Sequence, residues 1–338
     1  PCMNTIGNFG FLLIAVVGAV LASRPETDMF YISIGTIQAF ITYSKQFTRP
    51  INEIANQYAQ IQSALAGAER VFDVMDSEPE DQGGNEPFEI ENVKGDLNFK
   101  DIDFSYVKGE QVLKHFDLWV KSGQKIAIVG ATGSGKTTVV NLLTRFYDID
   151  GGVITLDGQD IRNIPVNKLR GSIGIVLQDT VIFSDTIAQN IRYGRIDATD
   201  EEIVEAAKIA RVDDFASKLS DGYNTMLTEG GSNLSQGQRQ LISIARAVLA
   251  DPKILILDEA TSSIDTRTEM HIQEAMVALM KGRTSLIIAH RLSTIRDADK
   301  IVVISGGKVV EAGDHDELLA QKGEYYKLYQ SQFAGIAT

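Results

Sequence analysis

Two long apolar segments without charge open the chain. Residues 1–23 contain no charged side chain, and residues 29–44 are again uncharged after a short polar turn. Because about 20 apolar residues span the ~30 Å hydrocarbon core of a bilayer, we expect two transmembrane helices. Lys45 and Arg49 follow the second segment, which predicts a cytoplasmic location for that end. A secretory signal peptide is the alternative, and the lack of Lys or Arg before the first apolar run disfavours it.

Beyond residue 49 the pattern changes to apolar residues spaced by three and four, with polar residues between them. This spacing is typical of a heptad seam on one helix. It predicts a single helix over residues 29–74, about 68 Å long, half of it in the cytosol and kinked near Pro50. A soluble amphipathic helix after a buried one is the alternative. The seam consists of Ile51, Ile54, Tyr58, Ile61, Leu65, Ala68 and Phe72.

The rest of the chain reads as an acidic connection followed by an α/β domain. Residues 76–95 are acidic and contain Gly and Pro, as in a linker or the lead-in to an edge strand. Five short apolar runs then alternate with helical patterns, which predicts a mainly parallel sheet buried on both faces. Turn signals at residues 156–160 and 305–309 predict added antiparallel hairpins. The runs cover residues 125–130, 171–178, 253–259, 284–290 and 300–305.

Composition narrows the function classes. The net charge of −13 argues against a general nucleic-acid binder, which would carry a basic face. A single cysteine, Cys2, allows no internal disulfide and favours a reducing compartment for most of the chain.

The stretch "GATGSGKTT" that follows the first apolar run fits the phosphate-binding loop pattern. Its glycines let successive N–H groups curl round phosphates, Lys136 would reach the β and γ oxygens, and the Thr137 hydroxyl would bind Mg²⁺. The strand before it and the helix after it agree with that pattern, so we expect a nucleoside triphosphate site. Its members are Gly130, Ala131, Thr132, Gly133, Ser134, Gly135, Lys136, Thr137 and Thr138.

Two carboxylates end a later apolar run. Asp258 would hold the magnesium shell, and Glu259 would orient and deprotonate the attacking water. Alone, such a pair is more often a solvated turn. Together with the upstream phosphate loop, it favours the catalytic interpretation.

Three further residues end apolar runs. His290 lies where sheet ligands bind, or it is structural. Gln178 could reach Mg²⁺ and the attacking water, or it is a turn residue. Tyr106 is either a core tyrosine or a platform on which a base stacks.

A second anion-binding element is predicted at "LSQGQRQ", residues 234–240. Small and amide residues there precede a helical apolar pattern, and a helix N-terminus with exposed N–H groups and a hydroxyl binds anions. The chain therefore offers two phosphate sites.

Together these motifs resemble the nucleotide-binding domain of ATP-binding cassette (ABC) exporters over essentially the whole chain. In that family's terms, Tyr106 is the adenine-stacking aromatic, residues 130–137 are Walker A, and Gln178 marks the Q-loop. Residues 234–238 are the signature, residues 254–258 Walker B, and residues 262–265 the D-loop. Glu259 resembles the catalytic glutamate and His290 the switch histidine, and residues 228–231 lie where exporters contact the membrane domain.

The resemblance implies a P-loop ABC ATPase core with an antiparallel β subdomain and a helical subdomain, preceded by transmembrane helices five and six. The expected divisions are residues 1–75 for the membrane part, 76–95 for the linker and 96–338 for the nucleotide-binding domain. It also implies ATP and Mg²⁺ as cofactors and a site in a bacterial inner membrane, in contact with membrane lipid, with the nucleotide-binding domain cytoplasmic.

The resemblance assigns the site residues in three groups. Lys136, Gln178, Glu259 and His290 would be catalytic, and Thr137, Gln178 and Asp258 would bind the metal. Nucleotide would be bound by residues 130–138 with Tyr106, Gln178 and Asp258, and in a partner's site by Ser235, Gly237, Gln238 and Asp265. In this family two domains associate head to tail, so the second phosphate site serves a neighbouring subunit.

Departures from the family pattern bear on the partner. The signature reads "LSQGQ", the D-loop reads "SSID", and Ala131 stands where Pro is frequent. These features resemble the intact-site chain of bacterial heterodimeric multidrug exporters, although a homodimer also fits. About two of an exporter half's six transmembrane helices are present, so transport would need the remaining helices as well as a second half-transporter chain.

Other cassette ATPases fit less well. Those of chromosome maintenance insert a long coiled coil between Q-loop and signature, whereas only residues 179–233 separate them here. Translation-associated proteins carry two such domains, and importer ATPases lack an apolar N-terminus. A degenerate regulatory domain would not keep both Glu259 and His290. Among exporter substrates, a drug, a lipid or a peptide would each fit.

Overall fold

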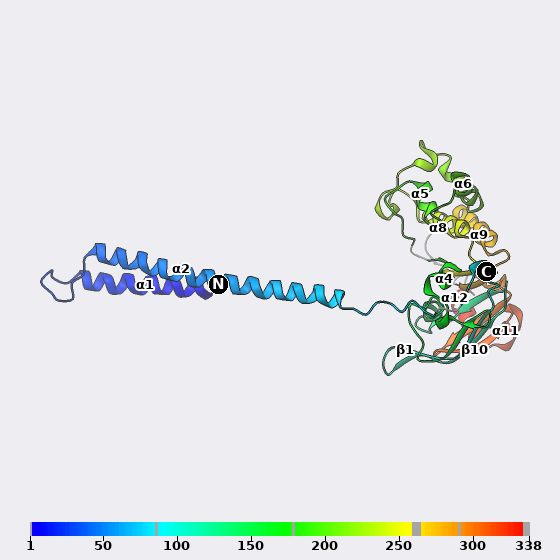
Figure 1. Ribbon diagram of the computed structural model, residues 1–338, viewed down its shortest axis with the longest axis horizontal. Helices are drawn as coiled ribbons and strands as arrows, with labels where there is room; N and C mark the ends of the chain where they lie inside the picture. Colours follow the sequence, from blue (N-terminus) through cyan, green and yellow to red (C-terminus); the bar gives the residue numbers. More distant parts are fainter. Residues whose placement is uncertain (1, 85–86, 178–179, 259–264, 290–291, 334–338) are drawn as a thin grey trace. The chain divides into compact units, whose positions relative to one another are not determined.

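The computed structural model describes residues 2–84, 87–177, 180–258, 265–289 and 292–333 (Figure 1). The chain divides into two compact units, Pro1–Glu80 and Asp81–Thr338. The division falls inside the acidic segment that the sequence marks as a connection.

The first unit is a pair of packed helices, α1 (Cys2–Ala22) and α2 (Ile34–Met75). The predicted long helix is present and contains Pro50, but it begins at Ile34 rather than Met29. Ser33 explains the later start, because its hydroxyl accepts a hydrogen bond from the Thr36 amide and caps the helix.

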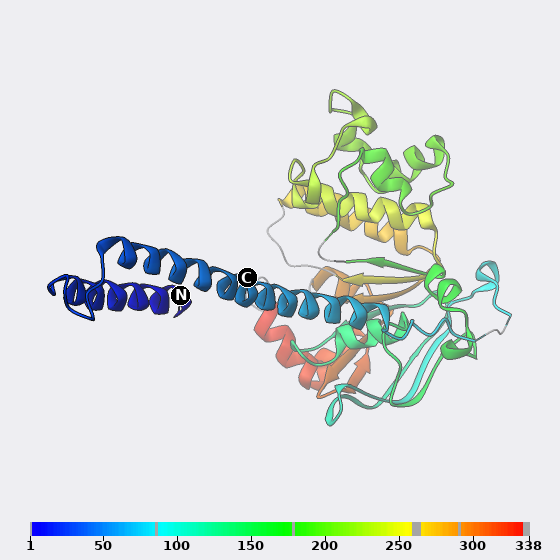
Figure 2. The same ribbon diagram turned by 60° about the vertical axis from the view of Figure 1, so that its left-hand side comes forward.

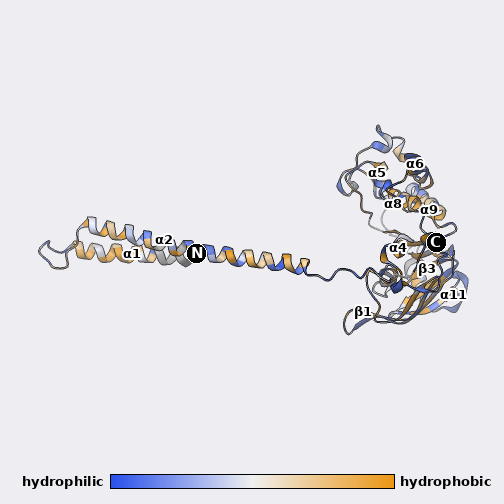
Figure 3. Cartoon of the chain, in the orientation of Figure 1, coloured by the Kyte–Doolittle hydropathy of each residue, from blue (hydrophilic) through white to orange (hydrophobic). Residues whose placement is uncertain are grey.

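Hydrophobic residues recur along both helices (Figure 3). Many of these residues are exposed, among them Phe9 at 68% and Ile54 at 69%. Over the described ranges, no helix combines the length and apolar character needed to cross a membrane. The two predicted spans are therefore not confirmed.

The second unit contains two sheets. The first is antiparallel, in the order β2-β1-β4-β5. The second has the order β10-β9-β3-β8-β7-β6 and is parallel except for the β9–β10 hairpin. Their strands are β1 (Leu97–Val107), β2 (Glu110–Val120), β4 (Gly151–Leu156) and β5 (Gln159–Asp160), then β3 (Lys125–Val129), β6 (Ile173–Val176), β7 (Ile254–Asp258), β8 (Thr284–Ile288), β9 (Lys300–Ser305) and β10 (Lys308–Gly313).

All five apolar runs form strands of the second sheet, and both predicted hairpins are present. Along β3, β7, β8 and β9, successive buried residues belong to different cores, because side chains alternate between the two faces of a strand. On β3, Ile126 and Ile128 pack with the antiparallel sheet and α3 (Lys136–Leu143), whereas Ala127 and Val129 pack with the helices of the other core. The prediction of a sheet buried on both faces is confirmed.

The remaining helices pack around the two sheets of the second unit. In Figures 1 and 2, α5, α6, α8 and α9 gather on one side of the second unit, away from β1 and β10. Among them, α8 packs against α5, α6 and α9. The bounds are α4 (Val166–Gly171), α5 (Ile187–Arg192), α6 (Asp200–Ile209), α7 (Asp213–Ala216), α8 (Gln236–Ala250), α9 (Thr266–Met280), α10 (Leu292–Arg296), α11 (His315–Gln321) and α12 (Glu324–Phe333).

Candidate functional site

The predicted phosphate loop joins β3 to α3 and is pressed between two other strands. A Cβ on Gly130 would lie 2.3 Å from the Ile304 carbonyl oxygen on β9, and one on Gly135 would lie 2.8 Å from Leu113 Cδ2 on β2. Gly135 also has a φ of 110°, which side chains rarely tolerate. A loop without side chains at these two positions therefore fits the space.

Lys136, the first residue of α3, folds back over this loop. Its Nζ donates to the carbonyl oxygens of Gly130 and Ala131 at 2.8 and 3.0 Å. Burial lowers the pKa of Lys136, and the charge of Asp258 opposes that shift. The ammonium group is thus held at the loop, where it can exchange its carbonyl partners for the oxygens of a bound anion.

The loop fits a phosphate ligand. The Ser134 hydroxyl is buried and has no hydrogen-bond partner within the described residues, so it can serve a ligand atom. The Thr137 side chain is exposed at the same end of α3, where α3 directs its free N–H groups. Among the residues described, no three His, Cys, Asp or Glu side chains form a metal cluster. A magnesium ion held by one hydroxyl, one carboxylate and phosphate oxygens needs no such cluster.

Tyr106 lies beside the loop as both a packed and an exposed residue. Its hydroxyl donates to Thr138 Oγ1 at 3.2 Å and accepts from Asn141 Nδ2 at 3.1 Å. Its ring packs edge to face against Phe104 and Tyr147, yet the residue is 45% exposed. Of the two interpretations of Tyr106, the core residue is excluded by this exposure, and the stacking platform stays a prediction.

A hollow of about 600 Å³ adjoins the exposed ring of Tyr106. It joins the β1–β2 turn, the phosphate loop and the β9–β10 turn, and it is large enough for a base and ribose. Its lining includes Tyr106, Val112, Lys114, Gly133, Gly306 and Gly307.

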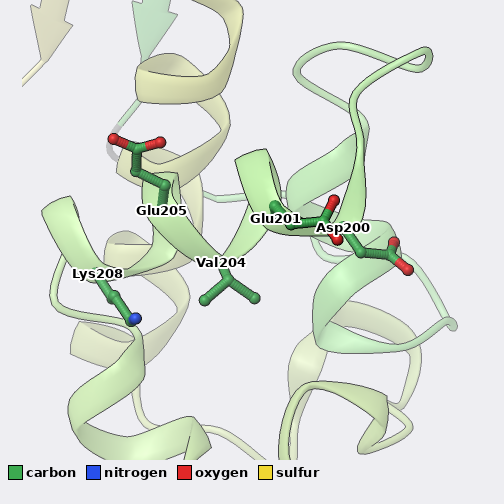
Figure 4. Close-up of a pocket in the computed structure, with 5 residues that line it drawn as sticks. All are labelled: Asp200, Glu201, Val204, Glu205 and Lys208. Atoms are coloured by element: carbon green, nitrogen blue, oxygen red, sulfur yellow. The ribbon is translucent and has the colours of Figure 1, made fainter.

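A second hollow, on α6, is chemically different (Figure 4). The charged side chains that line it are those of Asp200, Glu201, Glu205 and Lys208, which gives more negative than positive charge. Phosphate groups would be repelled there, so the hollow beside Tyr106 is the better nucleotide site.

The predicted second anion element is a capped helix start. Ser235 precedes α8, its Oγ accepts from the Gln238 amide at 3.2 Å, and the Gln238 side chain accepts from the Ser235 amide at 2.9 Å. This capping box confirms the predicted helix start. Gly237 is buried in the first turn, whereas Ser235 is exposed.

The two anion elements belong to different cores. The buried residues of α3, such as Leu142, pack with the antiparallel sheet, and those of α8, such as Leu241, pack with the helical layer. The sequence alone did not reveal this separation.

The remaining predicted residues divide into two groups. Asp258 ends β7, one strand away from β3 across β8, and its charge acts on Lys136. The carboxylate of Asp265 caps α9 by accepting from the Thr268 amide at 3.0 Å. Gln178, Glu259 and His290 lie outside the described residues.

Two contributors to the site were missed from the sequence: the Asn141 bond to Tyr106, and the glycines of the β9–β10 turn. The Gly306–Gly307 pair was recognised only as a hairpin signal. Its closeness to the phosphate loop depends on the pairing of β3 with β9, which local sequence does not encode.

Comparison with known proteins gives consistent results. Residues 113–262 match the "ABC transporter" family model. The chain is 54% identical over 331 residues to an uncharacterized ABC transporter ATP-binding protein, YfiC, of Bacillus subtilis, covering 98% of this chain and 54% of that protein. It is 51% identical over 328 residues to a fatty acid ABC transporter ATP-binding/permease protein of Mycobacterium tuberculosis, covering 97% and 51%.

Among solved structures, a bacterial Atm1-family ABC exporter with ATP bound is similar. It has a TM-score of 0.73 and 37% identity, covering 98% of this chain and 57% of that one. The chain spans about half the length of the curated relatives it matches.

Proposed function

Because the chain contains an ABC transporter ATP-binding domain, we propose that it binds and hydrolyses ATP to drive export across a membrane. The observation that carries this proposal is the phosphate loop. It combines a glycine backbone, the Lys136 ammonium group bonded to the Gly130 carbonyl oxygen, and a buried Ser134 hydroxyl that has no hydrogen-bond partner among the described residues. These are the groups that a triphosphate needs.

In this proposal each site residue has a separate task. Lys136 and the loop amides bind the β- and γ-phosphates, and Tyr106 stacks on the base. Thr137, Asp258 and Gln178 hold Mg²⁺, which when bound neutralises charge on the phosphates. Glu259 orients and deprotonates the attacking water, and His290 contacts the γ-phosphate.

The signature would serve a partner's nucleotide. The Ser235 oxygen already accepts a hydrogen bond in its own helix cap, but a hydroxyl keeps its proton to donate. Because Ser235 is exposed and α8 packs in a different core from α3, a second subunit's phosphate can approach it. Gly237, Gln238 and Asp265 would contact the same partner. We favour a heterodimer over a homodimer.

The first unit would be the end of a transmembrane domain. Residues 1–75 would be the last two helices with their cytosolic extension, residues 76–95 the linker and residues 96–338 the nucleotide-binding domain. Exposed apolar side chains on α1 and α2 support this assignment, as does the chain's match to about half of each relative. The relative named for fatty acids favours a lipid among the drug, lipid and peptide classes.

Replacing Glu259 with Gln tests the enzymatic proposal. ATP binding should persist while turnover falls roughly 10²–10⁴-fold, the usual contribution of a positioned general base. The measurement is phosphate release by the assembled transporter in lipid, with ATP binding measured on the same sample. Near-normal turnover in this variant would remove Glu259 from the role.

A further inference from the structure

A buried guanidinium group holds the start of the second unit in place. Arg145 has a side chain only 5% exposed, and its Nη2 donates to Asp81 Oδ2 at 2.5 Å. Its Nε donates to Asp148 Oδ1 at 3.0 Å and its Nη1 to the Arg162 carbonyl oxygen at 3.4 Å. Burial acts to lower the pKa of Arg145, but its hydrogen bonds to Asp148 and Asp81 raise that pKa overall. Hydrogen bonds from the Gly83 amide and from Arg145 lower the pKa of Asp81, so both groups remain charged across the neutral range.

The backbone around Asp81 fits closely against the same region. The Gly84 amide donates to the Arg162 carbonyl oxygen at 3.0 Å, and the Val166 amide donates to the Gln82 carbonyl oxygen at 2.9 Å. A Cβ on Gly84 would lie 2.6 Å from the Asn163 carbonyl oxygen. We call residues 81–84, with Arg145 and residues 162–166, the linker clasp.

The clasp lies at the far end of the phosphate-loop helix. α3 begins with Lys136 and ends at Leu143, and Arg145 follows its C-cap, Thr144. The helix is about 12 Å long at ~1.5 Å per residue, and its apolar residues are buried in one core. A short, packed helix moves as one body. A displacement of the N-terminal end of α3, at the phosphate loop, would therefore also displace Arg145.

The clasp also shortens the free connection after α2. Residues 76–80 separate Met75 from Asp81 and reach at most about 17 Å at ~3.4 Å per residue. Without the clasp, the next buried side chain among the described residues is that of Phe88, and residues 76–87 would reach about 41 Å. A slack connection of that length would absorb a displacement before it reached α2.

We propose that Asp81 and Arg145 are positioning residues that tether α2 to the phosphate-loop helix, so that an ATP-dependent shift of α3 is transmitted to α2. This inference rests on the proposed function, in which α2 belongs to the transport machinery. Neither residue contacts nucleotide, and their role is to remove slack from the connection.

The proposed tether is tested by replacing, one at a time, the two carboxylates that bind Arg145. Asp81→Asn and Asp148→Asn each remove one carboxylate from Arg145, but only the first releases the connection. Gly84→Ala displaces the connection sterically without changing charge. Each variant is made in the complete transporter in lipid nanodiscs, on a Glu259→Gln background that keeps ATP bound.

Hydrogen–deuterium exchange with and without Mg-ATP gives the readout. In the parent, ATP should change exchange both at residues 130–144 and at residues 51–75. Asp81→Asn and Gly84→Ala should keep the first change and reduce the second at least twofold, whereas Asp148→Asn should keep both. If all three variants keep the α2 response, the tether is overturned. A parent without any ATP-induced change at either segment would instead overturn the proposed function.

Discussion

Lys136 Nζ lies 2.8 Å from the carbonyl oxygen of Gly130, so the phosphate loop is closed by its own lysine. Burial already lowers the pKa of this ammonium group, which means that part of its hydration has been lost before any ligand arrives. An incoming phosphate therefore replaces weak carbonyl partners with charged oxygens, and the desolvation cost is small. The loop is prepared for an anion.

Replacing Lys136 with Ala should weaken Mg-ATP binding. A charge-assisted hydrogen bond contributes about 1.5–3 kcal/mol, so we expect roughly a 10- to 150-fold loss of affinity. Titration calorimetry with a non-hydrolysable ATP analogue measures it, with Lys208→Ala on α6 as the control. Equal affinities in the two variants would mean that the loop is not the nucleotide site.

Tyr106 separates base recognition from phosphate recognition. Removing its ring in Tyr106→Ala should lower ATP affinity by about 1–3 kcal/mol, the range for stacking of one base. Tyr106→Phe should retain most of it, although the bonds to Thr138 and Asn141 are lost. Inorganic tripolyphosphate is the control ligand, because it has no base. A parallel loss for both ligands would show that Tyr106 only supports the loop.

The close approach of Gly130 to β9 gives a test of loop geometry. Gly130→Ala must displace either the loop or Ile304, and it should reduce both stability and ATP affinity. Gly158→Ala is the matched control, since its Cβ meets open space and only its φ of 86° is strained. The control should cost about 1 kcal/mol of stability and leave ATP affinity unchanged. Thermal unfolding and ATP titration of both variants provide the comparison.

The sequence predicted most of the sheet and little of what surrounds the loop. Each buried strand is a short apolar run, and Gln238 follows the helix cap Ser235 by three residues, as in a capping box. Ser33 was overlooked as a cap, so the long helix was started too early. The linker clasp was not foreseen, because Asp81 and Arg145 are 64 residues apart in the sequence and no local pattern pairs them. Gln178, Glu259 and His290 stay predictions.

His315 should make the C-terminal helices sensitive to acid. Burial lowers its pKa below the ordinary 6.5, with a further lowering from Arg296, and its Nδ1 lies 2.7 Å from the hydroxyl of the buried Tyr325. The unfolded chain then binds this proton more readily than the folded one, so stability falls as pH drops below about 6.5. His315→Asn removes the titration. Between pH ~7.5 and ~5.5 the parent should lose more Tm than the variant, and an equal loss would exclude His315 as the cause.

The partner's use of the signature can be tested by mixing two inactive variants. Lys136→Ala removes phosphate binding, while Ser235→Asp keeps a good helix cap and places a negative charge where a partner's γ-phosphate would bind. A mixed dimer contains one site with both lesions and one with neither, so hydrolysis should reappear on mixing if the chain pairs with itself. With a heterodimeric partner, the phosphate-loop lesion is placed in one chain and the signature lesion in the other. Both lesions then fall in the same composite site, the second site stays intact, and hydrolysis should persist. Because Ser235→Asp preserves the cap, equal Tm values for it and the parent exclude unfolding of α8 as the reason for inactivity. Recovery in neither arrangement, together with hydrolysis that is linear in protein concentration, would show that Ser235 serves its own phosphate loop or none.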